Sequence, residues 1–276
     1  MARKESAKGK LTLITGASVG IGRELAKVFA EHGANLVLVS RSEDKLRELA
    51  SGLAEDFGIE AEVIAKDLLD PAAPREIFDA LQAEGKPVDI LVNNAGALEF
   101  GNFADMTVEE SDAMVQLNIA ALTKMTRLFV GPMAEKKSGR VLNVASIGGF
   151  QPIPSLAVYA ATKAYVLSLT ESLAEELRGT HVTVTALCPG LTKTDMLKKA
   201  SFSNEMARLL PSLILMNPHT VAREGYRACM MGRVLQVPGI ANQASVNWVR
   251  MQPRWVVRTI GGFFGRRLST YGQHEE

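Results

Sequence analysis

Seven short apolar runs recur along the chain, and stretches with helical periodicity separate most of them. The runs are almost continuously apolar, as expected for strands that are buried on both faces. We expect strands at residues 11–16, 35–40, 61–65, 89–93, 140–146, 181–187 and 233–237. Strands that alternate with helices form βαβ units, so the pattern predicts an α/β domain with one parallel sheet of about seven strands.

One continuous domain is expected between two short terminal segments. No Pro/Gly/Ser-rich linker divides the strands and helices, so residues 10–240 are expected to form a single catalytic or binding domain. We expect residues 1–9 to be a flexible N-terminus and residues 241–276 to be a C-terminal extension. The start is basic but lacks the apolar run of a signal peptide. No apolar run reaches the roughly 18 residues of a membrane-spanning helix.

Charge and cysteine content narrow the class of protein. The 276 residues include 31 Lys and Arg against 30 Asp and Glu, which gives no electrostatic reason for nucleic-acid binding. The two cysteines, Cys188 and Cys229, are far apart and lack the spacing of metal ligands. We therefore expect no metal site, no disulfide framework and a reducing compartment, so a cytoplasmic location is the simplest expectation.

A glycine-rich turn, TGASVGIG at residues 15–22, follows the first predicted strand and opens the first predicted helix. Glycines allow a pyrophosphate to approach the backbone, and a helix N-terminus offers free N–H groups and the positive end of its dipole. This context predicts a dinucleotide site, with a plain glycine turn as the alternative. The expected contacts are Gly16, Ser18, Gly20, Ile21 and Gly22.

The end of the second strand indicates which dinucleotide is preferred. An acidic residue there would accept a hydrogen bond from the ribose 2′-hydroxyl of NAD, whereas this chain has Ser40 and Arg41, which suit a 2′-phosphate. We therefore expect NADP(H) in preference to NAD(H), with a solvated Arg41 as the competing interpretation. Asp67, followed by Leu68, is placed either to accept from the adenine amino group or to belong to a helix N-cap region.

Further motifs lie beyond the fourth and fifth strands. NNAG at residues 93–96 supplies Asn94, Ala95 and Gly96, which allow close packing beside a cofactor, and its asparagines can pin neighbouring strand ends. In YAATK, residues 159–163, a phenol and an ammonium group lie four residues apart and share a helix face. Tyr-x-x-x-Lys is frequent by chance, so two unrelated residues of a core helix are the alternative.

The order of these motifs resembles that of the short-chain dehydrogenase/reductase family. TGASVGIG, NNAG, Asn118, Ser146, Tyr159, Lys163 and PGLTKT (189–194) follow one another, with Ser146 13 residues before Tyr159. The resemblance is dense over residues 10–197. It implies a Rossmann-type, doubly wound parallel sheet with helices on both faces, a nicotinamide cofactor, and hydride transfer between a carbinol and a carbonyl carbon.

The chemistry of the residues agrees with this resemblance. Reduction of a carbonyl needs a proton donor beside the developing alkoxide, and Tyr159 is expected to be that acid. A tyrosine has a pKa of about 10, and we expect the Lys163 ammonium to lower it. Ser146, at a strand end, is placed to hydrogen-bond the substrate oxygen. The resemblance implies that Lys163 also holds the nicotinamide ribose and that Asn118 helps to organise a water that relays protons to Lys163.

The turn PGLTKT follows the sixth strand, at the edge of the sheet where ligands bind in such folds. Pro189 and Gly190 fix the turn. The resemblance assigns Thr192 and Thr194 to the nicotinamide carboxamide and a nearby phosphate. The family more often has an aliphatic residue where Thr192 stands, but the contact is largely made by the backbone.

Apolar segments are expected to surround the substrate, including a lid over about residues 195–217. The expected pocket residues are Leu98, Gly148, Phe150, Ile153, Leu156, Met196 and Leu213. Such a pocket suits a lipophilic ketone, 3-oxoacyl or steroid-like compound, or secondary alcohol, while packing of the lid on the domain is the alternative. A non-catalytic NADP-binding regulator or scaffold is the alternative function, although it need not keep Asn118, Ser146, Tyr159 and Lys163 together.

The C-terminal extension is aromatic and basic. Arg250, Arg254 and Arg258 recur every four residues, as on one helical face, and Pro253 is expected to start a new helix. Three interpretations stay open: packing against the body or a partner subunit, peripheral contact with an anionic membrane surface, and a mobile extension.

Subunit contacts are expected on two helical segments, residues 109–135 and 156–177, of which the second is rich in alanine. We expect a homodimer through these segments. A tetramer is the alternative, and we expect the extension to obstruct the contact that many members of the family use to form it.

Overall fold

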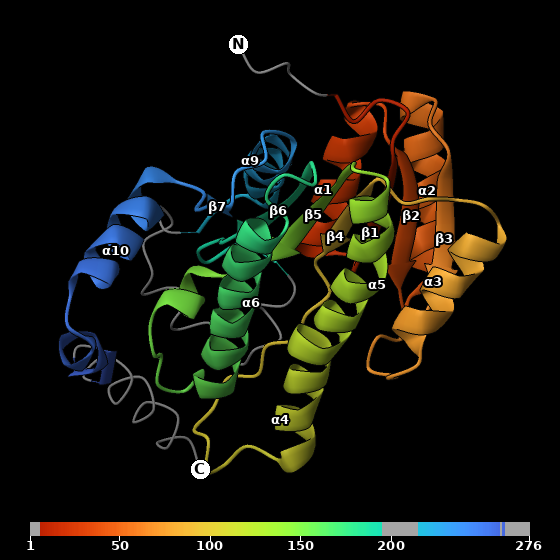
Figure 1. Ribbon diagram of the computed structural model, residues 1–276. Coiled ribbons are helices and arrows are strands. Elements are labelled where there is room, and N and C mark those ends of the chain that lie inside the picture. Colours follow the sequence, from red (N-terminus) through yellow and green to blue (C-terminus); the bar gives the residue numbers. More distant parts are fainter. Residues whose placement is uncertain (1–5, 195–214, 260, 263–276) are drawn as a thin grey trace.

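The structure is a computed structural model that describes residues 6–194, 215–259 and 261–262. It shows an open sheet between two layers of helices, with the C-terminal helix at one end of the molecule (Figure 1). The predictions for residues 1–5, for most of the lid and for the last residues of the extension lie outside the described residues. Met196 and Leu213 lie outside them as well.

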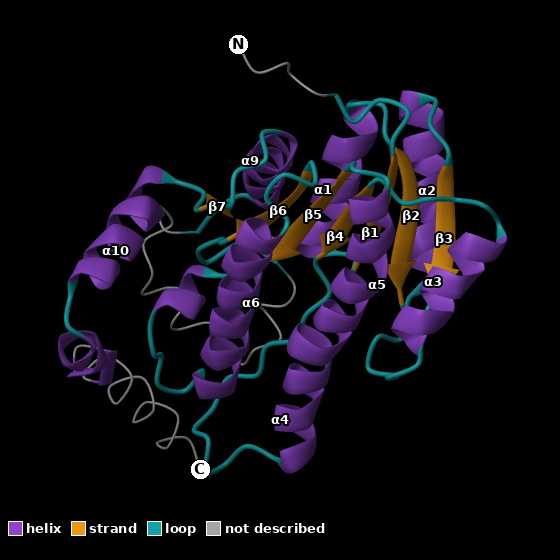
Figure 2. Ribbon diagram, in the orientation of Figure 1, coloured by secondary structure: helices purple, strands orange, loops and turns teal. Residues whose placement is uncertain are grey.

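Seven parallel strands form the sheet in the order β3-β2-β1-β4-β5-β6-β7 (Figure 2). They are β1 (Leu11–Thr15), β2 (Asn35–Ser40), β3 (Ala61–Ala65), β4 (Ile90–Asn93), β5 (Gly139–Val144), β6 (Val182–Leu187) and β7 (Leu235–Gln236). Every strand lies within one residue of a predicted run or inside it, so the strand predictions are confirmed. The chain builds outward from β1 in both directions, and the switch between β1 and β4 creates a crevice at their carboxyl ends.

Side chains alternate along the central strands, so each face of the sheet receives its own layer of helices. On β2, Leu36 and Leu38 join a core cluster with α1 (Gly20–Glu31), α2 (Glu43–Phe57) and α9 (Pro218–Met230). The intervening Val37 and Val39 join a second cluster with α3 (Ala73–Ala83) and α5 (Leu122–Glu135). The helix α6 (Ala157–Glu176) covers the α5 side next to β6 (Figure 1). The doubly wound architecture is therefore confirmed.

A π turn interrupts the helix between α4 and α5. The helix α4 (Val108–Val115) begins at Thr107, whose side chain forms a capping box with Glu110. The π turn η1 (Gln116–Ala121) follows, and α5 continues from Leu122. Such turns add a residue to the helix and are frequent at functional sites. The sequence predicted a helix here, and the π turn gives Asn118 a place that a regular helix would not.

The described part of the C-terminal extension packs against the body of the molecule. The helix α10 (Ile240–Met251) buries Val246 and Val249, and a second helical segment at 254–259 begins after Pro253, as predicted. The break at Pro253 means that the three evenly spaced arginines do not share one continuous helix, because proline lacks the N–H that would continue it. Among the described residues, no helix is long and apolar enough to cross a bilayer.

Candidate active site

A cavity of about 570 Å³ lies at the carboxyl ends of the strands. Its volume falls in the range of about 300–1,000 Å³ that is common for small-molecule sites. The same cavity is lined at one end by the glycine turn and at the other by Ser146, Tyr159 and Lys163. All the predicted cofactor contacts line it except Gly22: Gly16, Ser18, Gly20, Ile21, Ser40, Arg41, Asp67, Leu68, Asn94, Ala95, Gly96, Tyr159, Lys163, Pro189, Gly190, Thr192 and Thr194.

The glycine turn depends on three glycines in two different ways. Gly16 and Gly20 have φ values of +66° and +59°, a region that side chains rarely adopt. Gly22 is behind the turn, where a Cβ would lie 2.2 Å from the carbonyl oxygen of Gly16 and 2.4 Å from Asn94 Nδ2. Gly22 therefore contributes through close packing and makes no direct contact with the cavity.

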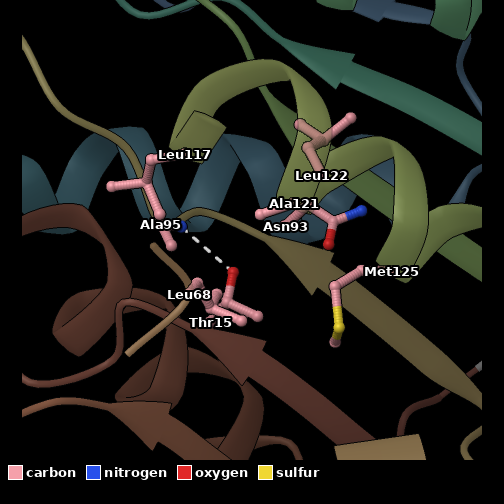
Figure 3. Close-up of a pocket in the computed structure, with 8 residues that line it drawn as sticks. All are labelled: Thr15, Leu68, Asn93, Ala95, Leu117, Ala121, Leu122 and Met125. Carbon is pink, nitrogen blue, oxygen red and sulfur yellow. Dashed lines mark hydrogen bonds between the residues drawn. The ribbon is translucent and has the colours of Figure 1, made fainter. Parts of the chain in front are cut away.

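Thr15 and Asn94 attach the glycine turn to β4. Asn94 Nδ2 donates to the carbonyl oxygens of Thr15 and Gly16 at 3.0 and 3.1 Å. Thr15 Oγ1 accepts from the backbone N–H groups of Asn94 and Ala95, each at 3.0 Å, and the Ala95 bond is drawn in Figure 3. Asn93 Nδ2 donates to Asn143 Oδ1 on β5 at 2.9 Å. The prediction that the asparagines pin neighbouring strand ends is thus confirmed.

A second, much smaller cavity lies beneath these contacts (Figure 3). Its volume of about 10 Å³ is room for roughly one water molecule. The lining residues come from the ends of β1 and β4, the loop after β3, the π turn and the first turn of α5: Thr15, Leu68, Asn93, Ala95, Leu117, Ala121, Leu122 and Met125. This space is too small for a substrate, so the chemistry belongs to the larger cavity.

Basic and hydroxyl side chains gather at the end of the large cavity near β2 and β3. Ser40, Arg41, Lys45 and Lys66 all line this end. Arg41 Nη1 is 3.8 Å from Asp67 Oδ2, and the two side chains are 70% and 45% exposed. An exposed pair at this distance is weak, so it leaves the Arg41 guanidinium available to a stronger anionic partner.

Ser146, Tyr159 and Lys163 meet at the other end of the cavity. Ser146 caps the 3₁₀ turn η2 (Ile147–Phe150), and its Oγ accepts from the Gly148 N–H at 3.0 Å. Tyr159 and Lys163 are one turn apart on α6, and Lys163 Nζ is 5.7 Å from the centroid of the Tyr159 ring. Lys163 is only 5% exposed and donates to the carbonyl oxygen of Val144 at 2.9 Å. The predicted shared helix face is confirmed.

Burial shifts the pKa values of both titratable groups in this cluster. It raises the pKa of the Tyr159 phenol, and the hydrogen bond with Ser146 opposes that change with a smaller effect. The net direction is therefore opposite to the predicted lowering, because burial of the phenol is the largest influence on its pKa. Burial lowers the pKa of Lys163 to about 8, since the ammonium has lost most of its water, and nearby Cys188 opposes this shift.

Asn118 reaches the cluster from the π turn without lining the cavity. Its Oδ1 accepts from the Ala97 N–H at 2.8 Å, and its Nδ2 donates to the Ala97 carbonyl at 2.9 Å and to Thr162 Oγ1 at 3.0 Å. A Cβ on Gly96 would lie 3.1 Å from Asn118 Oδ1 and 3.6 Å from Lys163 Nζ. Asn118 therefore fixes the loop after β4 against α6, and the water relay stays a prediction.

The substrate end of the cavity is largely apolar. Leu98, Gly148, Ile153 and Leu156 line it, together with the unpredicted Ile147 and Gln151. Phe150 does not line the cavity; the guanidinium carbon of Arg250 lies 5.8 Å from the centroid of its ring. The role of these residues in substrate binding stays a prediction.

The sequence and the structure both match known proteins. Residues 10–205 match the family model described as short chain dehydrogenase. The chain belongs to the short-chain dehydrogenase family. Oxidoreductase UcpA of Salmonella typhimurium is 37% identical over 222 residues, which cover 76% of this chain and 83% of the relative.

Two solved structures extend the match of this short-chain dehydrogenase to its fold. A short-chain dehydrogenase from Sphingobium yanoikuyae in complex with NADPH superposes with a TM-score of 0.78 and 30% identity, covering 87% of this chain and 93% of that one. A structure from a study of 7beta-hydroxysteroid dehydrogenase stereoselectivity gives a TM-score of 0.83 and 28% identity, covering 93% and 98%.

Some residues of this short-chain dehydrogenase line the cavity although sequence reasoning missed them. They are Val19, Val39, Ser42, Lys45, Lys66, Leu69, Ala97, Leu117, Val144, Ala145, Ile147, Gln151 and Leu191. Most are direct neighbours of motif residues, so extending each motif by one position would have found them. Lys45 and Val144 offered no such signal, because a lysine on a surface helix and a valine in a buried strand are ordinary.

Proposed function

We propose that the chain is an NADP(H)-dependent oxidoreductase that interconverts a lipophilic ketone and its secondary alcohol, with Tyr159 as the acid and base. One observation carries the proposal: Ser146, Tyr159 and Lys163 line the same cavity as the glycine turn. A cofactor on that turn and a substrate beside the tyrosine would therefore occupy one continuous space.

The residues present fit a dinucleotide. Gly16 and Gly20 have positive φ values that favour glycine, and because they carry no side chain a pyrophosphate can approach their backbone closely. Gly16, Ser18, Gly20 and Ile21 would hold that group, while Asn94, Gly96, Thr192 and Thr194 would border the nicotinamide half. When bound, the nicotinamide donates or accepts the hydride.

Basic side chains favour NADP(H) over NAD(H). Arg41, Lys45 and Lys66 line the end of the cavity where the second strand stops, and Ser40 adds a hydroxyl. This arrangement suits a 2′-phosphate, since guanidinium and ammonium groups bind phosphate through charge-assisted hydrogen bonds. The NADPH complex of the similar Sphingobium yanoikuyae enzyme supports the same choice.

The proton chemistry is assigned to Tyr159 with help from Ser146. Because burial raises the pKa of the phenol, Tyr159 is protonated at neutral pH, which is the form needed to protonate an alkoxide during reduction. Ser146 is placed beside it to hydrogen-bond the same substrate oxygen. Lys163 contributes a buried positive charge and its hydrogen bond to Val144, which together hold this end of α6 against β5.

The substrate class follows from the lining of the cavity. Leu98, Ile147, Ile153 and Leu156 surround the space beside Tyr159, and a lipophilic carbonyl compound would bury its apolar surface there. The similarity to the structure of the 7beta-hydroxysteroid dehydrogenase study is consistent with a bulky apolar substrate.

We also infer a cytoplasmic homodimer. The proposed contact uses α4, α5 and α6, where Val108 and Val115 are 68% and 44% exposed and Tyr165 is 36% exposed. Tyr165 Oη and Thr123 Oγ1 are hydrogen-bonded at 2.9 Å, which holds α6 and α5 in one surface. Analytical ultracentrifugation of the wild type and of Val108→Glu tests this state, because a buried charge in the contact would favour monomers.

The function is tested by following NADPH consumption with a panel of ketones that ranges from polar sugars to steroids. We expect turnover with apolar ketones, and loss of about 10²–10⁴-fold in kcat for Tyr159→Phe with NADPH binding retained. Turnover of Tyr159→Phe at the wild-type rate would refute the assigned acid. NADPH binding without turnover of any substrate would favour the scaffold alternative.

A further inference from the structure

The outer side of α10 carries an uninterrupted apolar surface. Ile240, Trp248 and Met251 are 86%, 47% and 81% exposed, and Ala241 and Ala244 are exposed between them. At about 100° per residue, these five positions fall within one arc of the helix. We name this surface, Ile240, Ala241, Ala244, Trp248 and Met251, the α10 stripe.

The α10 stripe is held rigidly away from the core. The opposite side of α10 buries Val246 and Val249, at 4% and 8% exposure. Asn242 Nδ2 donates to the carbonyl oxygen of Pro238 at 2.9 Å, and Gln243 Nε2 donates to that of Val237 at 2.9 Å. The helix projects from one end of the molecule, farthest from α2 and β3 (Figure 1). The stripe therefore faces outward because the opposite side of the helix is anchored.

The charged residues of the segment that carries the stripe are all basic. No aspartate or glutamate occurs between Glu224 and Glu275. Arg250, Arg254 and Arg258 are exposed, and none of them has a salt bridge within the described part of the chain. Trp255, in the segment after Pro253, is 64% exposed and adds a second tryptophan.

We propose that the α10 stripe docks on an anionic lipid surface. Exposed apolar patches bordered by polar residues mark interaction sites, and tryptophan prefers the level of the lipid headgroups. Basic side chains beside such a face gain about 1 kcal/mol each near an anionic leaflet. An amphipathic helix with these features lies in the plane of the interface, and here the protein body already holds it in place.

The positive charge of this segment favours an anionic lipid surface, rather than a second copy of the chain, as the partner of the α10 stripe. A two-fold contact through the stripe would bring Arg250, Arg254 and Arg258 of both subunits to one interface. The segment contains no acidic residue that could offset their repulsion. Lipid phosphates supply the missing negative charge, whereas a second α10 would add more positive charge.

The docked helix would also adjoin the substrate end of the site. Arg250 packs over Phe150, and a Cβ on Gly261 would lie 3.3 Å from the carbonyl oxygen of Pro152. Both contacts are made to the loop that supplies Gln151 and Ile153 to the cavity. Entry of a membrane-dissolved substrate into the cavity from this side depends on the proposed enzymatic function. Docking of the stripe on lipid does not depend on it.

Vesicle co-sedimentation of the full-length protein tests the proposal. We expect partition onto vesicles of phosphatidylcholine with phosphatidylglycerol, and at least about tenfold weaker partition onto phosphatidylcholine alone. Trp248→Glu and Met251→Glu should each weaken binding to the anionic vesicles by about tenfold or more. The matched control is Phe57→Glu, because Phe57 is 39% exposed on α2 at the other end of the molecule and should leave partition unchanged.

Four outcomes would overturn docking through the stripe. They are no partition of the wild type, equal partition onto both vesicle types, unchanged partition of Trp248→Glu, and a lower oligomeric mass of Trp248→Glu in sedimentation velocity. NADPH binding and ketone turnover, measured on the same variants without vesicles, report on the proposed enzyme separately. Failure of the enzyme assignment would therefore be distinguishable from failure of docking.

Discussion

Lys163 donates from Nζ to the carbonyl oxygen of Val144 at 2.9 Å, and this bond joins α6 to the end of β5. The ammonium is 5% exposed and has no carboxylate partner among the described residues. The hydrogen bond fixes Lys163 in position, and burial lowers the pKa of its ammonium to about 8. A buried charge with few compensating partners is costly, so its protonation should be visible in the stability of the protein.

The pH dependence of stability is the first prediction. The pKa of Lys163 is about 8 in the folded protein and 10.5 ordinarily, so both states are protonated below pH 8. Between these values only the unfolded chain binds the proton, so the free energy of unfolding of the wild type should gain up to about 3 kcal/mol relative to that of Lys163→Met as the pH rises. The difference between the two proteins is the measure, because burial raises the pKa values of Cys188 and Cys229, which lowers the stability of both proteins over the same window. Urea unfolding of the two cofactor-free proteins measures it, and a wild-type curve parallel to that of the variant would contradict the assignment.

Replacement of Arg41 should weaken the binding of NADPH but not the binding of NADH. We expect Arg41→Ala to raise the Kd for NADPH by about tenfold, the value of one charged hydrogen bond of about 1.5 kcal/mol, and to leave the Kd for NADH unchanged. Fluorescence titration with each nucleotide measures both constants. Arg47→Ala is the control, since Arg47 lies on α2 outside the cavity and pairs with Glu43. Equal weakening of both nucleotides would mean that Arg41 does not bind a 2′-phosphate.

Two glycine-to-alanine changes should have opposite effects. A methyl group at Gly22 would lie 2.2 Å from the carbonyl oxygen of Gly16, so Gly22→Ala should lower the free energy of unfolding by about 1–3 kcal/mol and weaken nucleotide binding. Gly52, inside α2, has open space around the added carbon. Gly52→Ala should stabilise the protein by about 0.5–1 kcal/mol through helix propensity. Thermal melts and nucleotide titrations distinguish the two, and a neutral Gly22→Ala would argue against the close packing.

Loss of the Asn118 side chain should act through the loop after β4. Asn118→Ala leaves both backbone groups of Ala97 without their partner, so we expect a stability loss of about 1–3 kcal/mol. Asn118→Asp keeps the acceptor for the Ala97 N–H but loses the donor to the Ala97 carbonyl and to Thr162. Because Asn118 is fully buried and the aspartate would set an acceptor oxygen against the Ala97 carbonyl, the stability of Asn118→Asp should be no higher than that of Asn118→Ala. If Asn118 only filled space, the Asn118→Asp protein would be as stable as the wild type. Chemical denaturation of both proteins distinguishes these outcomes.

The fold could be predicted because its signals are local and repeated. Strands that are buried on both faces give apolar runs, and the motifs at their carboxyl ends converge because parallel strands end at one edge. Gly16, Asn94, Tyr159 and Pro189 thus came together in one cavity although they are far apart in sequence. Spacing alone did not identify Tyr159, which was assigned through the order of the motifs along the chain and the family resemblance that this order carries.

Side-chain direction and environment could not be predicted in the same way. Phe150 faces Arg250 because α10 packs beside it, and nothing in either local sequence indicates that meeting. The sign of the Tyr159 shift depends on how much water surrounds the phenol, which is a property of the assembled core. Lys45 reaches the cavity only through the position of α2. These features depend on tertiary packing, which periodicity does not encode.

The π turn at Gln116–Ala121 makes the orientation of Asn118 depend on the number of residues in the helix. An ordinary α-helix turns by about 100° per residue, so one residue more or fewer rotates everything beyond it. Here the additional residue is taken up locally, which lets α4 and α5 keep separate packing faces while Asn118 points inward. A single-residue deletion in this turn would restore regular helix geometry and at the same time swing the asparagine out of register with Ala97. In this molecule the helix could become regular only by losing the hydrogen bonds that join Asn118 to Ala97 and Thr162.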